Sequence, residues 1–454
     1  MISSPQQLAD WDRDHVWHAF TQMAEYQPFL IASAQGRTLV DIHGKTYLDG
    51  VSSLWCNLLG HRVPELDKAI REQLDQVAHV TLLGMGHPTT ARLARKLAEL
   101  APAGMEHVFF SDSGASAVEV ALKLAFQYQR QRPDPRPAKT EYIALTDAYH
   151  GDTLGAVSVG GVARFHALFD PLLFPVRRLP APDLYRLPPG VTAEQARDYY
   201  TAQLEQLLAE HHATIAAMII EPLMQCAAGM LAHPVGYLQK VRELTQRYDV
   251  LLIADEVAVG CGRTGTLFAC QQEQVAPDLL CLAKGLTGGY LPLAATLASK
   301  QIYQAFLGDF AAGRTFFHGH TYGGNPLGAA AALATLEYLE TQQILENLPP
   351  RIDRLRARLD RIGRHGHVGD IRQRGMIVGI ELVRDKTTRE SFAWTERRGW
   401  RVCQRALEKG VWLRPLGNVV VIFPPLTTTL AELDQICAAV EESIQEEFAR
   451  EGLE

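Results

Sequence analysis

Two charged side chains follow apolar runs in the middle of the chain, where they could act on a bound ligand. Asp255 ends the run VLLIAD, and Lys284 follows the next run, LLCLA. The carboxyl ends of parallel strands form the edge at which open α/β sheets bind ligands. Alone, such an Asp is more often a cap and such a Lys is more often solvated. Together they suit carbonyl chemistry, in which a lysine amine forms an imine and a carboxylate pairs with a protonated ring nitrogen.

A turn rich in small residues provides a candidate anion site. Residues 112–116, DSGAS, join an apolar run to a helical pattern that begins near Ala117. Backbone amides at the N-terminus of a helix favour a phosphate group, because the helix dipole is positive there. Ser116 and Glu119 have the spacing of a capping box, which explains the serine but not the small residues before it. The turn is therefore a candidate phosphate site.

An aromatic side chain follows another apolar run. Tyr149 stands shortly after YIALTD, in the stretch YHGD (149–152). A ring in this position can stack on a planar ligand such as a pyridine, although packing in the core explains a single tyrosine equally well.

Other motifs do not support a dinucleotide or metal site. Residues 260–265, GCGRTG, match the G-x-G-x-x-G pattern, but the strand before them ends at Asp255 and no long helix opens on the third glycine. The histidine pairs at 318/320 and 365/367 lack a third ligand at a recognisable spacing, so we predict no metal.

The elements that must position these residues alternate along residues 107–299. Near-continuous apolar runs and helical patterns follow one another, as in a mostly parallel sheet that is buried on both faces. A helix is expected over 117–128, where apolar residues recur at i, i+3 and i+4. The pattern predicts an α/β fold in three layers. The predicted strands are HVFFSD (107–112), YIALTD (142–147), IAAMIIEP (215–222), VLLIADEV (250–257), LLCLA (279–283) and LAATLA (293–298).

The pattern changes after about residue 335. A charged helical pattern over 336–362 precedes two predicted strands, GMIVGIELV (375–383) and VVVIFPP (419–425), and a capping box at Thr429 and Glu432 opens a final amphipathic helix.

With 454 residues, the chain is long enough for two domains. We expect a large ligand-binding domain over 61–334. A smaller α+β domain would combine an N-terminal part, 1–60, with a C-terminal part, 335–454.

Composition limits the partners. The chain has 44 basic and 51 acidic residues and a net charge of -7, which argues against a general affinity for nucleic acid or anionic membranes. Seven scattered cysteines without a C-x-x-C pair indicate reduced thiols in a cytoplasmic protein. We find no secretory signal and no apolar stretch long enough to span a bilayer, so we expect no membrane association.

With these residues assembled, the chain resembles the class III aminotransferases, which have fold type I and use pyridoxal 5'-phosphate (PLP), over nearly its whole length. The resemblance implies a seven-stranded sheet in the large domain, PLP as cofactor, and a homodimer with active sites at the subunit interface. The matching motifs, in order, are SDSGASAVEVALK, YHGDTLGA, IIEPL, LLIADEVAVGCGRTG, CLAKGLTGG and HGHTYGGNPL.

The resemblance also implies a role for each matching residue. Lys284 would carry PLP as a Schiff base and move a proton, and Asp255 would pair with the pyridinium nitrogen. Gly114 and Ala115 would hold the phosphate through backbone amides, and Tyr149 would stack on the ring.

Three further positions take their roles from the same resemblance. His320 and Thr321 would reach the phosphate bound by the neighbouring subunit, and Gly319 would lie at the substrate. Arg263 would hold a second carboxylate or form a structural ion pair.

Within this family the chain is most similar to the branch that converts 8-amino-7-oxononanoate to 7,8-diaminononanoate in biotin biosynthesis. In that branch Phe20, Leu54 and Trp55 would line the substrate site, and Arg414 would receive the carboxylate of the acceptor. The similarity rests on WHAFTQM (17–23), GVSSLWCNLLGH (50–61), YHGDT (149–153) and WLRPLG (412–417).

The amino donor is expected to be S-adenosylmethionine or L-lysine. Enzymes that use S-adenosylmethionine typically have Tyr in place of Phe20 and Trp in place of Leu54. Losing a hydroxyl and an aromatic wall removes groups that would recognise an adenine ring, so we favour lysine. Val259 and Cys261 also replace the usual Thr and Phe, which leaves the packing near the cofactor open.

Two alternatives remain. A class III aminotransferase for an ω-amino acid, ornithine or a polyamine would share the cofactor residues, and only Phe20, Trp55 and Arg414 argue against it. A protein with this fold but without transaminase activity would have no need of the intact pair Lys284 and Asp255.

Overall fold

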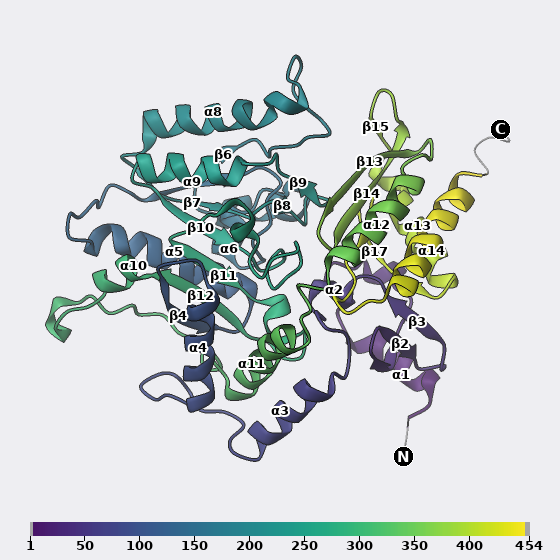
Figure 1. Cartoon of the computed structure of the whole chain (residues 1–454), viewed down its shortest axis with the longest axis horizontal. Coiled ribbons are helices and arrows are strands. Elements are labelled where there is room, and N and C mark those ends of the chain that lie inside the picture. Colours follow the sequence, from purple (N-terminus) through teal and green to yellow (C-terminus); the bar gives the residue numbers. More distant parts are fainter. Residues whose placement is uncertain (1–2, 450–454) are drawn as a thin grey trace.

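The largest sheet of the protein has seven strands in the order β4-β12-β11-β10-β7-β5-β6 (Figure 1). The structure, a computed structural model, describes residues 3–449. Only β12 runs antiparallel to its neighbours in this sheet, so the predicted mostly parallel α/β fold is confirmed. Its strands are β4 (Met105–Ser111), β5 (Glu141–Leu145), β6 (Arg177–Leu179), β7 (Ile215–Ile220), β10 (Leu251–Asp255), β11 (Leu279–Leu282) and β12 (Ala294–Ser299).

Alternating side chains of the central strand β10 contact different helices. Leu251 and Ile253 lie in one apolar cluster with helix α5 (Gly114–Gln131). Leu252 and Ala254 lie in a second cluster with helix α9 (Tyr237–Arg247). Because successive side chains of a strand point to opposite faces, the sheet is covered on both sides, as its apolar runs predict.

Further helices complete the large lobe. Helix α11 contacts α3 and α4, and helix α8 contacts α9. Their bounds are α3 (Pro64–Leu74), α4 (Pro88–Leu100), α6 (Leu154–Val159), α7 (Ala163–His166), α8 (Ala193–His211), α10 (Lys300–Ala305) and α11 (Pro326–Thr341).

Strands from both ends of the sequence form the smaller lobe, on the right of Figure 1. A four-stranded sheet has the order β1-β2-β3-β16, in which β16 runs parallel to β3 although the two are far apart in sequence. A five-stranded sheet contains β13, β14, β18 and β17, with β15 paired to β14. The strands are β1 (Ile31–Gln35), β2 (Thr38–Asp41), β3 (Thr46–Asp49), β13 (Val368–Arg374), β14 (Ile377–Asp385), β15 (Glu390–Ser391), β16 (Val411–Trp412), β17 (Arg414–Leu416) and β18 (Val419–Ile422).

Four helices accompany these sheets: α1 (Pro5–His15), α12 (Pro349–Ile362), α13 (Arg398–Glu408) and α14 (Leu430–Phe448). The predicted capping box of α14 is confirmed, because Thr429 and Glu432 bond each other's backbone amides. The domain division at 60/61 and 334/335 stays a proposal, and its second boundary falls inside α11.

The single helix predicted over 336–362 is wrong. Two helices occupy this range, because α11 ends at Thr341 and α12 begins at Pro349. The break lies at Gln343, whose positive φ of 48° leaves the helical region, and Pro349 then opens α12, since proline suits the first position of a helix.

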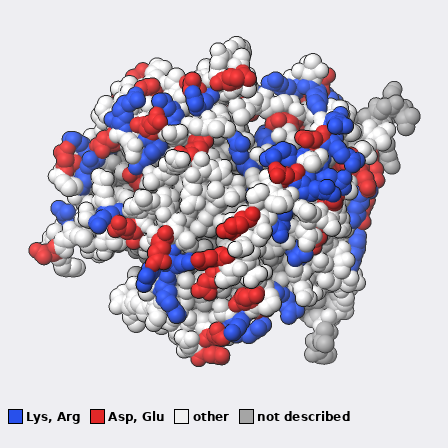
Figure 2. Space-filling view, in the orientation of Figure 1, with Lys and Arg blue, Asp and Glu red and all other residues white. Residues whose placement is uncertain are grey.

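Acidic and basic side chains lie next to one another over much of the face in Figure 2, with basic side chains densest over the smaller lobe near α12 and β13. Among residues 3–449, no helix has the length and apolar character that crossing a membrane requires. All seven cysteines are free thiols, and only Cys56 is partly exposed.

Candidate active site

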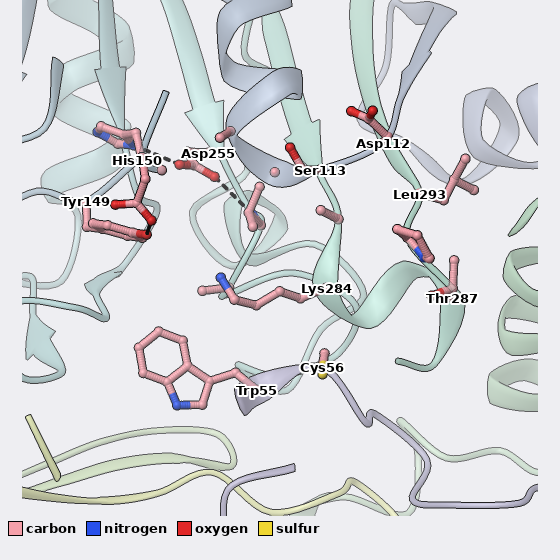
Figure 3. Close-up of a pocket in the computed structure, with 18 of the residues that line it drawn as sticks. Trp55, Cys56, Asp112, Ser113, Tyr149, His150, Asp255, Lys284, Thr287 and Leu293 are labelled. Atoms are coloured by element: carbon pink, nitrogen blue, oxygen red, sulfur yellow. Dashed lines mark hydrogen bonds and ion pairs between the residues drawn. The ribbon is translucent and has the colours of Figure 1, made fainter. Parts of the chain in front are cut away.

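A cavity of about 660 Å³ opens at the carboxyl ends of β10 and β11. Asp255 is the last residue of β10, and Lys284 begins a short 3-10 turn directly after β11. Figure 3 shows the Lys284 side chain extending into the cavity between Asp255 and Trp55. The residues predicted to carry carbonyl chemistry therefore meet, together with Gly114, Ala115 and Tyr149, in the lining of one cavity.

Hydrogen bonds fix the carboxylate of Asp255. Its Oδ1 accepts from the amide of Val257 at 3.0 Å, and its Oδ2 accepts from Nδ1 of His150 at 2.7 Å. Both side chains of the Asp255–His150 pair are almost fully buried. A buried carboxylate held in this way presents a fixed negative charge to the cavity.

A second carboxyl group, Glu221, lies beside this pair. It accepts from the amides of Tyr149 at 3.2 Å and Cys226 at 2.9 Å. Burial raises the pKa of Glu221 to about 7, and the charge of Asp255 acts in the same direction. The site therefore holds one fixed charge and one carboxyl group that can retain its proton near neutral pH.

The turn before α5 has the geometry of an anion site. Ser113 is the N-cap, and it exchanges hydrogen bonds with Ser116, whose amide donates to Ser113 Oγ at 3.2 Å. The predicted capping box of Ser116 and Glu119 is wrong, because Glu119 instead accepts from the amide of Gly155 at 2.8 Å, near the start of α6. A Cβ on Gly114 would lie 2.6 Å from Val257, so the small residue permits this close approach.

Tyr149 reaches the cavity from the side opposite Ser113 (Figure 3). Its hydroxyl donates to Asp152 Oδ2 at 2.7 Å. Burial, with help from this hydrogen bond, raises the pKa of Tyr149, so the phenol remains protonated in the physiological range.

A smaller hollow of about 160 Å³ continues from the cavity and shares Trp55, Tyr149 and Lys284 with it. The family resemblance predicts Phe20, Leu54 and Arg414 at a substrate, and all three line this hollow. Phe165, which the sequence did not indicate, also lines it and packs edge-on against Phe20 at 5.3 Å.

Arg414 lies at this apolar end of the site. It is largely buried, which lowers its pKa, and no carboxylate in residues 3–449 forms an ion pair with it. A buried guanidinium beside an apolar hollow suits the carboxylate of a ligand.

Gly319, His320 and Thr321 line neither the larger cavity nor the smaller hollow. Nδ1 of His320 lies 2.9 Å from Asp112, which is on the rim of the larger cavity. Their predicted reach into the neighbouring subunit stays a prediction.

Arg263 forms no ion pair within residues 3–449, and its predicted contact with a second carboxylate of a ligand stays a prediction. It is buried, and it donates to the carbonyl oxygens of Pro424 and Trp55 while its guanidinium stacks on Phe423 at 4.6 Å. Val259 and Cys261 are also buried and lie outside both linings, so their substitutions do not change the cavity walls.

His150 and Glu221 are functional candidates that sequence reasoning missed. Glu221 ends the run IAAMIIE, and β7 is the neighbour of β10, so the argument that selected Asp255 applied to it equally. His150 directly follows Tyr149, but no sequence signal indicates that it faces Asp255.

Comparison with known families matches residues 21–444 to the class III aminotransferases. The chain belongs to this family.

Several similar proteins share the name adenosylmethionine-8-amino-7-oxononanoate aminotransferase. The chain is 50% identical to the one from Geobacter sulfurreducens, over 97% of both chains. It is 51% identical to the one from Nitratidesulfovibrio vulgaris, over 97% of this chain and 82% of the relative. The crystal structure of the Methanocaldococcus jannaschii protein of this name aligns with a TM-score of 0.92 at 43% identity, covering 97% of this chain and 99% of that one.

Other enzymes of related activity share the fold. An (S)-enantioselective omega-transaminase from Thermomicrobium roseum aligns with a TM-score of 0.94 at 34% identity, covering 98% of this chain and 100% of that one.

Proposed function

We propose that the protein is a PLP-dependent aminotransferase that converts 8-amino-7-oxononanoate to 7,8-diaminononanoate in biotin biosynthesis. One observation carries the proposal: Lys284 and Asp255 meet in a cavity that continues past Trp55 and Tyr149 to Arg414. An amine, a carboxylate and a guanidinium along one path support this proposal.

The residues of the larger cavity fit PLP. A helix N-terminus with small residues suits its phosphate, a carboxylate suits its ring nitrogen, an aromatic ring suits its face, and Lys284 suits its aldehyde. Bound PLP would serve as an electron sink for the amino-carrying carbon of the substrate.

The chain supplies the groups around that chemistry. Asp255, oriented by His150, would keep the ring nitrogen protonated. Lys284 would hold the cofactor until the donor amine displaces it, and its freed amine would then move the proton. Tyr149, held by Asp152, would fix the plane of the ring.

Arg414 and the apolar walls support the acceptor. The oxononanoate is an apolar chain with a carboxylate at one end, and the hollow lined by Phe20, Leu54 and Phe165 leads to Arg414, which pairs with no carboxylate among residues 3–449. The names of relatives that are 50% identical specify the same acceptor.

Two donors remain candidates, and they are supported by different observations. The relatives' names specify S-adenosylmethionine. Phe20 and Leu54 offer no hydroxyl and no second aromatic wall for an adenine ring, so the preference for lysine stays a prediction that those names do not support.

We further propose a homodimer in the cytoplasm. Exposed apolar side chains gather near Gly319. Leu83 lies beside this glycine, because a Cβ added to Gly319 would be 3.1 Å from the Leu83 side chain. Leu83, Phe317 and Tyr322 expose 64%, 78% and 63% of their surface, which suits burial against a second copy. Sedimentation should give about twice the mass of the chain, and a monomer would contradict the proposal.

Half-reaction spectra test the function. PLP-loaded protein is mixed separately with S-adenosylmethionine and L-lysine, and the absorption of bound PLP is followed as it converts to the pyridoxamine form. Adding 8-amino-7-oxononanoate should restore the first spectrum. Restoration only by the keto partners of ω-amino acids, ornithine or polyamines would transfer the assignment to that alternative, and the donor that converts the spectrum decides between lysine and S-adenosylmethionine.

A further inference from the structure

The loop that carries Leu54 and Trp55 into the site has a strained backbone. Ser52, Ser53 and Trp55 have positive φ angles of 51°, 58° and 66°. Ser53 combines its φ with a ψ of -79°, close to the γ-turn of positive φ, which is rare. Because residues with a Cβ avoid these conformations, surrounding contacts must impose them.

Asp49, the last residue of β3, provides those contacts. Both of its carboxylate oxygens lie 2.9 Å from the amide nitrogen of Ser53, and Oδ1 also accepts from the amide of Val51 at 3.3 Å. The Asp49 side chain has no exposed surface. Burying a carboxylate is costly unless its oxygens are bonded, so this group ties the loop to one geometry.

His61 holds Asp49 from the other side. Its Nε2 donates to Asp49 Oδ2 at 2.9 Å. The backbone of His61 is itself anchored, because it exchanges two hydrogen bonds with Gly36, of 2.7 and 2.9 Å. Neither Asp49 nor His61 lines the cavity or the hollow.

The loop geometry sets the position of an aromatic ring at the reacting end. The Trp55 ring stacks on Phe423 with centroids 5.4 Å apart and lies 5.4 Å from Nζ of Lys284. Ser52 fastens the loop to the same neighbour by donating to the carbonyl of Phe423 at 2.8 Å. If the loop relaxed, Leu54 and Trp55 would move away from Phe423 and Lys284.

We propose that Asp49 and His61 are positioning residues that determine substrate specificity: by holding the strained loop 51–55, they keep Leu54 and Trp55 in the walls that receive an apolar substrate chain. This inference rests on the proposed function, because it assigns the walls to that substrate.

Kinetics of three variants test the role in catalysis. Asp49→Ala should raise the KM for 8-amino-7-oxononanoate about tenfold or more, because the strained loop relaxes, while PLP binding stays within about twofold. Asp49→Asn should recover most of the loss, since its amide can accept from Ser53 and donate to His61. The control is Asp41→Ala, which removes another buried carboxylate that binds loop amides, those of His43 and Lys45, away from the cavity.

A measurement without substrate separates this inference from the proposed function. In protein labelled with 5-fluorotryptophan, the ¹⁹F resonance of Trp55, assigned from its loss in Trp55→Phe, should shift or broaden in Asp49→Ala. It should stay in place in Asp49→Asn and Asp41→Ala. This readout decides the positioning role even if the protein turns over no oxononanoate.

The outcomes are distinct. An unchanged Trp55 resonance together with an unchanged KM in Asp49→Ala overturns the proposal, and so does an equal effect of Asp41→Ala on both. If Asp49→Ala does not fold, His61→Ala carries the test, because it removes the bond that holds Asp49 Oδ2 in place and so should shift the Trp55 resonance and raise the KM in the same direction, by less. The His61 side chain is 13% exposed, so its loss disturbs the core less than the loss of Asp49.

Discussion

At the scale of single residues, the two ends of the site differ in the side chains that surround their basic residues. Lys284 shares its surroundings with an aromatic ring and a fixed carboxylate, whereas Arg414 lies among apolar side chains without a carboxylate partner in residues 3–449. Lys284 lines both the larger cavity and the smaller hollow, so under the proposed function substrate and cofactor would meet at its amine.

Lys284→Ala should lower kcat by on the order of 10³-fold or more, because the attachment point and the proton carrier are lost together. Treatment with borohydride and PLP, followed by intact mass measurement, should show an adduct in the wild type and none in the variant. Lys300→Ala, at an exposed lysine, is the control. Retained turnover in Lys284→Ala would contradict the assignment of Lys284 as the residue that carries PLP.

Arg414→Gln should raise the KM for the oxononanoate by about 10- to 100-fold, the equivalent of one charge-assisted hydrogen-bonded contact. Arg414→Lys should recover part of the affinity, because it keeps the charge but not the planar fork. Steady-state kinetics check both. Equal KM values in wild type and Arg414→Gln would show that the carboxylate binds elsewhere.

At the scale of elements, the start of α5 approaches the end of β10 closely enough to exclude a side chain. Gly114→Ala should push Val257 away and disturb the amides of the phosphate turn, at a cost of about 1–3 kcal/mol in stability. PLP affinity and the midpoint of thermal unfolding should both fall. Gly366→Ala is the matched control, because a Cβ there meets nothing within 4 Å; equal effects would contradict the explanation.

The apolar runs predicted six strands of the large sheet and β14 and β18 of the smaller lobe, but not β6 or the other strands of the smaller lobe. Apolar runs such as VLLIAD identify buried strands because both faces are covered, and the charged residues at or just after the ends of β7, β10 and β11 (Glu221, Asp255 and Lys284) line the cavity. The Asp255–His150 and Asp49–His61 pairs could not be predicted, since both join residues whose proximity depends on the folded chain. The capping error at α5 arose because Glu119 has a competing donor, Gly155, on another element.

At the scale of the whole molecule, two buried carboxyl groups couple folding to pH. Burial raises the pKa of Glu221 and Glu256 to about 7, above the ordinary value of 4.5. Between these values the folded chain keeps protons that the unfolded chain releases. Their contribution to stability is therefore fully present below pH 4.5 and is lost as the pH rises through about 7.

Glu221→Gln should reduce the fall in the free energy of unfolding between pH 5 and pH 8 by on the order of 2 kcal/mol, because the amide cannot release a proton. Urea unfolding at pH 5 and pH 8 measures the difference for each variant. Glu346→Gln, at an exposed position, should behave as the wild type. A wild-type stability that rises between pH 5 and pH 8, with the same slope in Glu221→Gln, would contradict the expectation.

The parallel pairing of β3 with β16 has a consequence for synthesis on the ribosome. Leu48 lies opposite Val411, so the four-stranded sheet lacks its last strand until about 360 further residues have been translated. At about 5–20 residues per second, the nascent β3 edge waits on the order of 20 to 70 s for its partner. During that interval β3, which leads into the loop that carries Leu54 and Trp55, has an unpaired edge, which makes it a target for chaperones.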